Sequence, residues 1–340
     1  MTRGISHRAS LAGAAVLIAL ITGCGSGSKE SAAEAGAGKK ETPKHSAQGV
    51  ISTKKASQLL DHYVSVNNRA NAKRDGKLLS TVEGGGLLEQ STADYKQYAA
   101  FSKKDKAAYG TPFYYVDRRY YIPRKGVADW FAVSAKLKDR EGTSKERSYL
   151  VFDRLDDGPW KIVASVHMKR PVAPAKDKDG FVQAVSASAT QGSMAPDKLT
   201  DGLQRLYTER DVSASGLKPN KLARNINKGA WKAVDGVGRG GRLRWIDGGT
   251  RYTQVYAMKM RGGQIYSVFN TPVDKSVRVT KPGYNANPDK FQQVYTGKSD
   301  AQGIMSAYLH QSSAFIPAKG KPELLTTESI LIGAERESGF

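Results

Sequence analysis

The hydrophobic pattern of this 340-residue chain changes twice from a helical period to an alternating one. Residues 53–73 space Ala56, Leu60 and Val64 as on one face of a helix, and Ser52 can cap its start. Residues 78–88 predict a short helical segment broken by a glycine turn. The alternation that follows predicts strands at 113–122, 130–137, 148–155 and 160–168. This order favours helices packed on an antiparallel sheet.

The last two of these strands form a predicted hairpin around the turn sequence Asp-Asp-Gly-Pro at residues 156–159. On its second strand, the side chains expected to face the core are Trp160, Ile162, Ala164 and Val166.

The second half of the chain repeats the same broad order. Helices are predicted at residues 197–207 and 219–234. The strands predicted to follow them are 242–246, 251–260, 264–271, 275–280, 304–316 and 324–334. Helix first and sheet after, twice, suggests two similar α+β units.

Two stretches carry a resemblance to a known fold. They are Asn71-Ala72-Lys73-Arg74-Asp75, at the end of the first helix, and Asp157-Gly158-Pro159-Trp160-Lys161-Ile162, at the last hairpin of the first half. With these stretches, residues 50–170 resemble the nuclear transport factor two-like cone, and the resemblance implies a curved sheet wrapped round a helix.

We therefore expect an α+β protein with two cone-like domains in tandem. The expected division is a signal peptide at 1–23, a lipidated cysteine and tether at 24–49, a first domain at 50–172, a linker at 173–192 and a second domain at 193–340. The whole resembles the lipoproteins of unknown function that are common in actinobacteria.

The front of the chain has the three parts of a secretory signal: a basic start, an apolar run at residues 11–21, and small residues before Cys24. Ile21-Thr22-Gly23-Cys24 resembles the lipobox of bacterial lipoproteins. The resemblance implies diacylglycerol on the Cys24 sulfur and cleavage between Gly23 and Cys24. Cys24 is also the only cysteine of the chain, so disulfides do not support the fold. The expected location is the outer face of the cell membrane.

The chain is strongly basic, with a net charge of +21. Residues 50–174 and 191–340 each carry a net charge of +9, so the charge is spread evenly. A nucleic-acid-binding protein concentrates it on one face, and we expect no nucleic-acid partner. An even positive field suits either solubility or a surface of anionic lipid headgroups and phosphate-bearing wall polymers.

Several short stretches match motifs of catalytic or ligand-binding sites, but each lacks the sequence context that its motif requires. Ser52-Thr53-Lys54-Lys55 matches S-x-x-K but lacks its partner motifs, and helix capping explains Ser52 better. Residues 236–241 match G-x-G-x-x-G but follow a helix and precede a strand, which predicts a loop. Residues 177–180 lack the remaining ligands of a calcium loop and predict a turn. We expect no catalytic residues, no metal site and no cofactor. The sets left open for a cone enzyme are His62 with Asp61 and His167 with Tyr115.

One basic constellation remains, at residues 224–252. Arginines in this segment alternate with aromatic residues, an arrangement that suits phosphate or carboxylate groups of a polymer. The candidate anion-binding residues are Arg224, Arg239, Arg242, Arg244, Arg251 and Trp245. The alternative is a solvated basic face with aromatic residues in the core.

The sequence thus predicts a lipid-anchored envelope protein that acts as a non-enzymatic binding or accessory module. Its predicted contacts are the membrane, through diacylglycerol on Cys24, and an anionic wall polymer or lipid headgroups. The alternative function is that of a small hydrolase or isomerase acting in the cone-shaped pocket of one domain.

Overall fold

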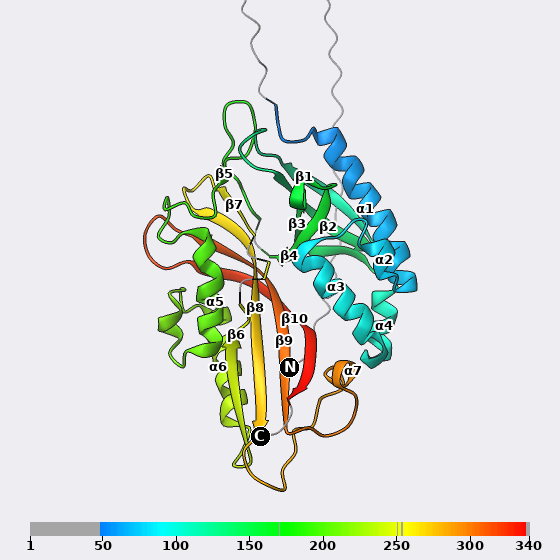
Figure 1. The fold of residues 1–340 in the computed structure, drawn as a ribbon. Helices are drawn as coiled ribbons and strands as arrows, with labels where there is room; N and C mark the ends of the chain where they lie inside the picture. The colour runs from blue at the N-terminus through cyan, green and yellow to red at the C-terminus, as the bar shows by residue number, and fades with distance from the viewer. Residues whose placement is uncertain (1–47, 170, 250, 253, 338–340) are drawn as a thin grey trace, which may run out of the picture. The chain divides into compact units, whose positions relative to one another are not determined.

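The structure, a computed structural model, describes residues 48–337 except 170, 250 and 253 (Figure 1). Cys24 and the predicted signal and tether therefore lie outside the described residues. The described residues belong to one compact unit. None of their helices is long and apolar enough to cross a membrane.

The first half of the chain forms four α-helices followed by one antiparallel sheet. The helices are α1 (Thr53–Lys73), α2 (Gly76–Leu79), α3 (Gly85–Gln97) and α4 (Lys103–Tyr109). The strands are β1 (Tyr114–Tyr121), β2 (Trp130–Asp139), β3 (Gly142–Asp153) and β4 (Lys161–Met168). They pair antiparallel in the order β1-β2-β3-β4. Helix α4 was not predicted.

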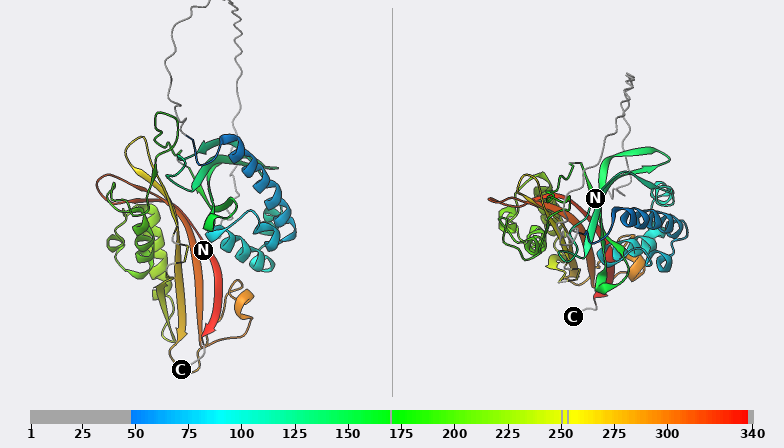
Figure 2. Two further views of the ribbon diagram at one scale, coloured as in Figure 1. Left: turned by 45° about the horizontal axis from the view of Figure 1, so that its top comes forward. Right: turned by 90° about the horizontal axis from the view of Figure 1, so that it is seen from above.

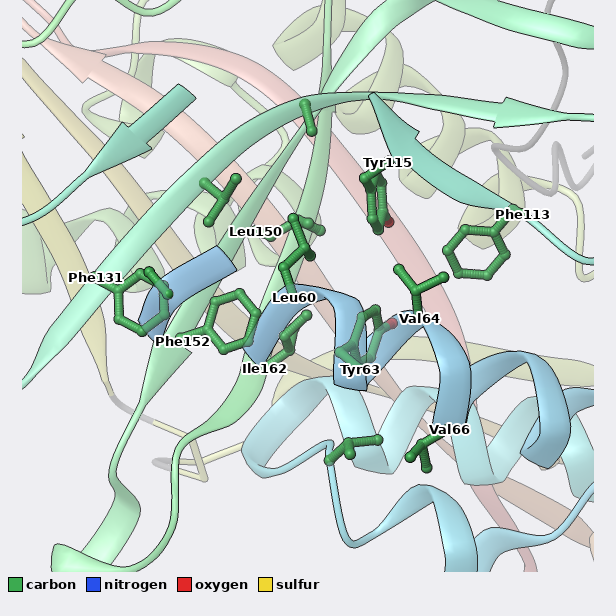
Figure 3. Close-up of a cluster of buried hydrophobic side chains, with 14 of the residues drawn as sticks. Leu60, Tyr63, Val64, Val66, Phe113, Tyr115, Phe131, Leu150, Phe152 and Ile162 are labelled. Atoms are coloured by element: carbon green, nitrogen blue, oxygen red, sulfur yellow. The ribbon is translucent and has the colours of Figure 1, made fainter. Parts of the chain in front are cut away.

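Helix α1 begins and ends where local chemistry dictates. The Ser52 hydroxyl accepts a hydrogen bond from the Lys55 backbone at 3.2 Å, as expected of a capping residue. Arg74 ends the helix in the left-handed conformation. The apolar face of α1 packs against the sheet, and Figure 3 shows Leu60 beside Phe152 and Leu150. This face was read correctly from the 3.6-residue period.

The second half has a six-stranded sheet. Its strands are β5 (Ala184–Val185), β6 (Gly241–Asp247), β7 (Val255–Lys259), β8 (Ile265–Val279), β9 (Gly303–Ile316) and β10 (Glu323–Glu337). Its helices are α5 (Leu199–Thr208), α6 (Lys221–Asp235) and α7 (Gln293–Thr296). The order is β10-β9-β8-β7-β5, with β6 also paired to β8. Helices α5 and α6 lie along one side of this sheet (Figure 2).

Strand β8 corrects the sequence prediction. Two strands, 264–271 and 275–280, were expected, but a single strand runs through Pro272. A proline has no N–H to donate to a neighbouring strand. Here β7 pairs with β8 only up to Phe269, and β6 pairs with it only from Val273. Pro272 therefore lies at the exchange of partners, where the missing donor does not interrupt a ladder.

The two halves share a hydrophobic core. Tyr149 and Tyr266, one from each sheet, pack edge to face with ring centroids 4.9 Å apart. Ile162, Ala164 and Val166 are buried as expected, whereas Trp160 is half-buried. The register shift in the β3–β4 pair lies at Val163, so the side chains do not all share one face as expected. Ile162 packs in the cluster under α1, whereas Val163, Ala164 and Val166 pack in the cluster shared with the second sheet. The first sheet is thus covered on both faces.

Helix α3 adds polar contacts between the halves. The Gln90 amide donates to the Leu309 carbonyl of β9 at 2.7 Å. The Gln97 amide donates to the Leu331 carbonyl, beside a register shift between β9 and β10. Both glutamines thus link α3 to backbone carbonyl groups of the second sheet. The α+β class, with helices packed on an antiparallel sheet in each half, is confirmed, and the boundaries 50–172 and 193–340 stay a prediction.

Candidate functional site

A basic groove lies between the end of α4 and the hairpin that joins β2 to β3. Its side chains include three cations, one acid and an exposed tyrosine, and its full lining is Lys106, Ala107, Gly110, Thr111, Pro112, Tyr114, Lys138, Asp139 and Arg140. Tyr114 is 58% exposed, an unusual state for a large aromatic side chain. Tyr114 and Lys138 are direct partners across the β1–β2 ladder, so they share a face of the sheet.

The single acid of the groove is already engaged in its loop. Asp139 accepts a hydrogen bond from the Glu141 backbone at 2.7 Å. Lys106 donates to the Ala99 carbonyl at 2.8 Å, which holds its ammonium group in place. Lys138 and Arg140 are exposed. Flexible cations beside an exposed ring can bind phosphate, sulfate or carboxylate groups of a polymer.

Sequence reasoning missed this groove. Its cations come from two short basic runs, 103–106 and 136–140, which are about thirty residues apart in the sequence. Only the folded chain brings the end of α4 beside the β2–β3 hairpin, so that both runs line one groove. Both basic runs can be seen in the sequence. Because the charge is spread evenly along the chain, nothing in the sequence indicates that these two runs lie close together in the fold.

The predicted arginine cluster is divided between elements. Arg242 and Arg244 alternate with Leu243 on β6 and are both exposed. Arg242 lies opposite Arg278, which forms a two-point ion pair with Glu337 at 2.6 and 3.1 Å. This part of the sheet is therefore mixed in charge.

The other candidates do not converge on these two arginines. Trp245 lies on the opposite face of β6, where its indole donates to the Ala230 carbonyl of α6 at 3.1 Å and its ring packs on Tyr207. Arg224 is exposed on α6, and Arg239 is exposed in the turn before β6. Arg251 lies near Asp274, whose pKa burial raises and Arg251 lowers. Arg242 and Arg244 stay together as a predicted pair, and Trp245 has a packing role.

A polar cluster fills the cone of the first half. Glu83 lies beside Tyr63 of α1, whose hydroxyl donates to its carboxylate at 3.0 Å. The Asn67 amide donates to the same oxygen, also at 3.0 Å. The network continues through Asn71 to the Tyr95 hydroxyl. Burial raises the pKa of Glu83 to about 7, against the opposing effect of hydrogen bonds from Ser91, Tyr63 and Asn67.

The two sets left open for a cone enzyme have different surroundings. His62 is exposed, and Asp61 pairs with Arg118 at 2.7 Å. His167 contacts the Ser148 hydroxyl at 3.2 Å, and Ser148 also hydrogen-bonds Tyr115. His167 and Tyr115 are thus joined through a serine on the inner face of the sheet.

The cone is closed around its polar cluster. Glu83 is only 1% exposed, and Tyr63, Asn67 and Tyr115 are buried around it. A substrate cannot reach the carboxyl in this conformation. The raised pKa therefore acts on the stability of the fold rather than on a bound molecule. Sequence reasoning missed Glu83, although a lone acid between Val82 and three glycines is a visible signal.

The remaining motifs have structural roles. Residues 236–240 connect α6 to β6, as expected of a loop, and the Gly180 backbone donates to Asp177 in a turn. His310 is buried between Thr327 and Ser329, and burial lowers its pKa to about 4, so it is neutral at pH 7. Among the described residues, no three His, Cys, Asp or Glu side chains are grouped to hold a metal ion.

The comparison with known families covers all but the last of the described residues. A family model, described as a domain of unknown function (DUF8094), matches residues 47–336. The chain belongs to this family. The groove, the cone cluster and the β6 arginines all lie within the matched DUF8094 segment.

Two proteins of Streptomyces coelicolor, each named an uncharacterized lipoprotein, are similar to this DUF8094 chain. One is 26% identical over 93% of this chain and 90% of its own length. The other is 30% identical over 53% of this chain and 52% of its own length. Among solved structures, an Ntf2-like protein involved in plasmid conjugation aligns with 10% identity over 80% of this chain and 96% of its own. Its TM-score of 0.20 is too low to carry an argument.

Proposed function

We propose that this chain is a lipid-anchored protein on the outer face of the cell membrane, and that its folded part binds an anionic polymer of the envelope. The lipobox-like Ile21-Thr22-Gly23-Cys24 and the lipoprotein names of the two relatives support the anchor. The basic groove beside Tyr114 supports the binding role and is the observation that carries it.

The position of the groove suits a partner away from the membrane. The chain enters the folded unit at residue 48, whose carbonyl accepts from Lys125 in the loop after β1. The groove lies at the other end of the same strands, beside the first residue of β1 and the last residue of β2. At about 3.3 Å per residue, strands of eight and ten residues separate these ends by roughly 25–30 Å. The anchor then presents the groove outward.

The groove is tested with a soluble chain, residues 24–340 carrying Cys24→Ser, and two polymers, polyphosphate and polygalacturonate. We expect the double variant Lys138→Ala/Arg140→Ala to bind about tenfold more weakly, because each exposed charge contributes up to about 1 kcal/mol. Binding of the unchanged groove should fall steeply with salt. Titration by fluorescence anisotropy across a salt series measures both effects.

The matched control for the groove is Arg242→Ala/Arg244→Ala, which removes the same charge from the predicted arginine pair. It should bind nearly as well as the unchanged chain. A larger loss in this control would place binding on β6, and no binding of either polymer at low salt would refute the polymer proposal. A preference for polyphosphate or for polygalacturonate would tell phosphate from carboxylate polymers.

The anchor is tested in cells. We expect Cys24→Ser to move the protein from the membrane fraction to the medium, because the only thiol able to carry the lipid is lost. Ser26→Ala is the control and should stay with the membrane. The intact mass of the membrane-bound protein should include diacylglycerol and lack residues 1–23. Membrane retention of a Cys24→Ser protein whose intact mass lacks residues 1–23 would contradict the anchor.

A further inference from the structure

The place where the chain enters the folded unit is a lysine-rich surface. The Lys125 backbone donates to the Gln48 carbonyl at 2.9 Å, and the Val50 backbone donates to the Pro123 carbonyl at 2.9 Å. The segment 174–183 lies against the same loop, because Pro123 and Lys176 both form bridges with Val182. Three segments distant in the sequence therefore meet where residue 48 enters.

We define the root surface as the exposed side chains around this entry point. Its members are Lys54, Lys55, Lys125, Val127, Lys176 and Lys178. Lys54 and Lys55 are in the first turn of α1, which begins five residues after the entry of the chain at residue 48. Val127 is 60% exposed at the loop that follows β1, which makes it the most exposed large apolar side chain in the described part.

Two of the three acids near the root surface share one arginine, so the five lysines of the root surface still outnumber the negative charges left unbalanced. Arg124 pairs with Asp177 through its Nε atom at 2.6 Å, and its second nitrogen pairs with Asp179. Asp129 is exposed at the end of the loop. No ion pair is formed by the five lysines of the root surface among the described residues. Their ammonium groups are free for an external anion.

The proposed anchor would hold this surface close to a membrane. Cys24 and Gln48 are separated by 24 residues, which span at most about 80 Å when fully extended. Tethering within this distance gives the root surface a high effective concentration at the bilayer. One lysine near an anionic membrane improves binding only about fivefold, so a lysine surface is useful mainly when an anchor keeps it there.

We propose that the root surface is a second membrane contact, in which its lysines bind anionic lipid headgroups and Val127 enters the headgroup region. This inference rests on the proposed membrane location. The partner of the root surface is the lipid next to the anchor, whereas the groove lies at the opposite end of β1 and β2. The contact would orient the folded unit with the groove away from the membrane.

The test separates this contact from the anchor. The only cysteine of the chain, Cys24, is coupled to a maleimide lipid in vesicles, so attachment does not depend on lipidation in cells. The protein used is residues 24–340, which keeps the whole described unit. Vesicles contain phosphatidylcholine alone or with about a third phosphatidylglycerol. Hydrogen–deuterium exchange is followed in segments 122–128 and 174–183.

We expect slower exchange in both segments on the anionic vesicles only. The uncoupled chain should partition onto the same anionic vesicles, and Lys125→Ala/Lys176→Ala/Lys178→Ala should lower this partitioning about 100-fold. The matched control, Lys228→Ala/Lys281→Ala/Lys298→Ala, removes equal charge from exposed positions elsewhere and should lose much less.

Three results would overturn the root surface. These are equal protection on neutral and anionic vesicles, equal losses in the two triple variants, or no protection of either segment on anionic vesicles. Failure of the anchor in cells would leave this experiment unaffected, because the lipid is supplied chemically. The two proposals therefore fail separately.

Discussion

Tyr266→Ala is expected to lower the free energy of unfolding by about 3–5 kcal/mol, the usual cost of truncating a buried aromatic side chain. Tyr266 has no exposed surface. Its ring packs on Tyr149 at 4.9 Å and on Phe315 at 5.7 Å, and its hydroxyl contacts the Met168 sulfur at 2.8 Å. Because Tyr149 and Met168 belong to the first sheet, the cavity would weaken both halves together.

Urea unfolding combined with hydrogen exchange measures this effect. Amides of β2 and β8, which lie in different sheets, should lose protection in the same transition. Tyr266→Phe keeps the ring and should cost below about 1.5 kcal/mol. Tyr284→Ala is the exposed control, since Tyr284 is 54% exposed, and should cost little. Continued protection of β2 after β8 has unfolded would show that the shared core does not couple the halves.

Glu83→Gln is expected to stabilise the protein at pH 8 and to leave it nearly unchanged at pH 4.5. Burial raises the pKa of Glu83 to about 7 in the folded chain, against an ordinary value of 4.5. The folded state therefore favours the protonated carboxyl. The stabilisation that this carboxyl contributes is fully present below pH 4.5 and is lost as the pH rises through 7. At about 1.36 kcal/mol for each pH unit, the loss amounts to roughly 3 kcal/mol.

Urea unfolding of both proteins at pH 4.5, 6 and 8 measures this difference. A glutamine keeps an oxygen that accepts from Tyr63 and Asn67 and cannot ionise. Glu141→Gln is the control, because Glu141 is exposed, and it should change the free energy of unfolding little. A constant difference between Glu83→Gln and the unchanged chain at all three pH values would exclude a titration at Glu83.

The closed cone also bears on the alternative function. A hydrolase or isomerase needs its acid or base within reach of a substrate. Glu83 has the raised pKa of a catalytic acid, but Tyr63, Asn67 and Tyr115 enclose it. The groove beside Tyr114 is open to solvent and carries charge suited to a polymer. The proposed binding role therefore rests on the groove and not on the cone.

Local chemistry determined much of the fold from the sequence. Helix α1 was predicted at its observed bounds, 53–73, because the 3.6-residue period and the Ser52 cap act within a few residues. The strands of the first sheet were predicted for the same reason, since alternation and turn residues are local signals. The lipobox-like front was also visible, and it remains a prediction outside the described residues.

Tertiary structure alone decided the features that depend on distant partners. Strand β8 continues through Pro272 because β7 and β6 exchange there, and no signal near Pro272 describes those strands. Glu83 acquires its raised pKa from burial under α1 and α3, which a sequence pattern does not encode. Likewise, Lys138 and Lys106 share a groove only because folding places the end of α4 beside the β2–β3 hairpin. Short-range preferences set the elements, whereas burial and charge depend on long-range packing.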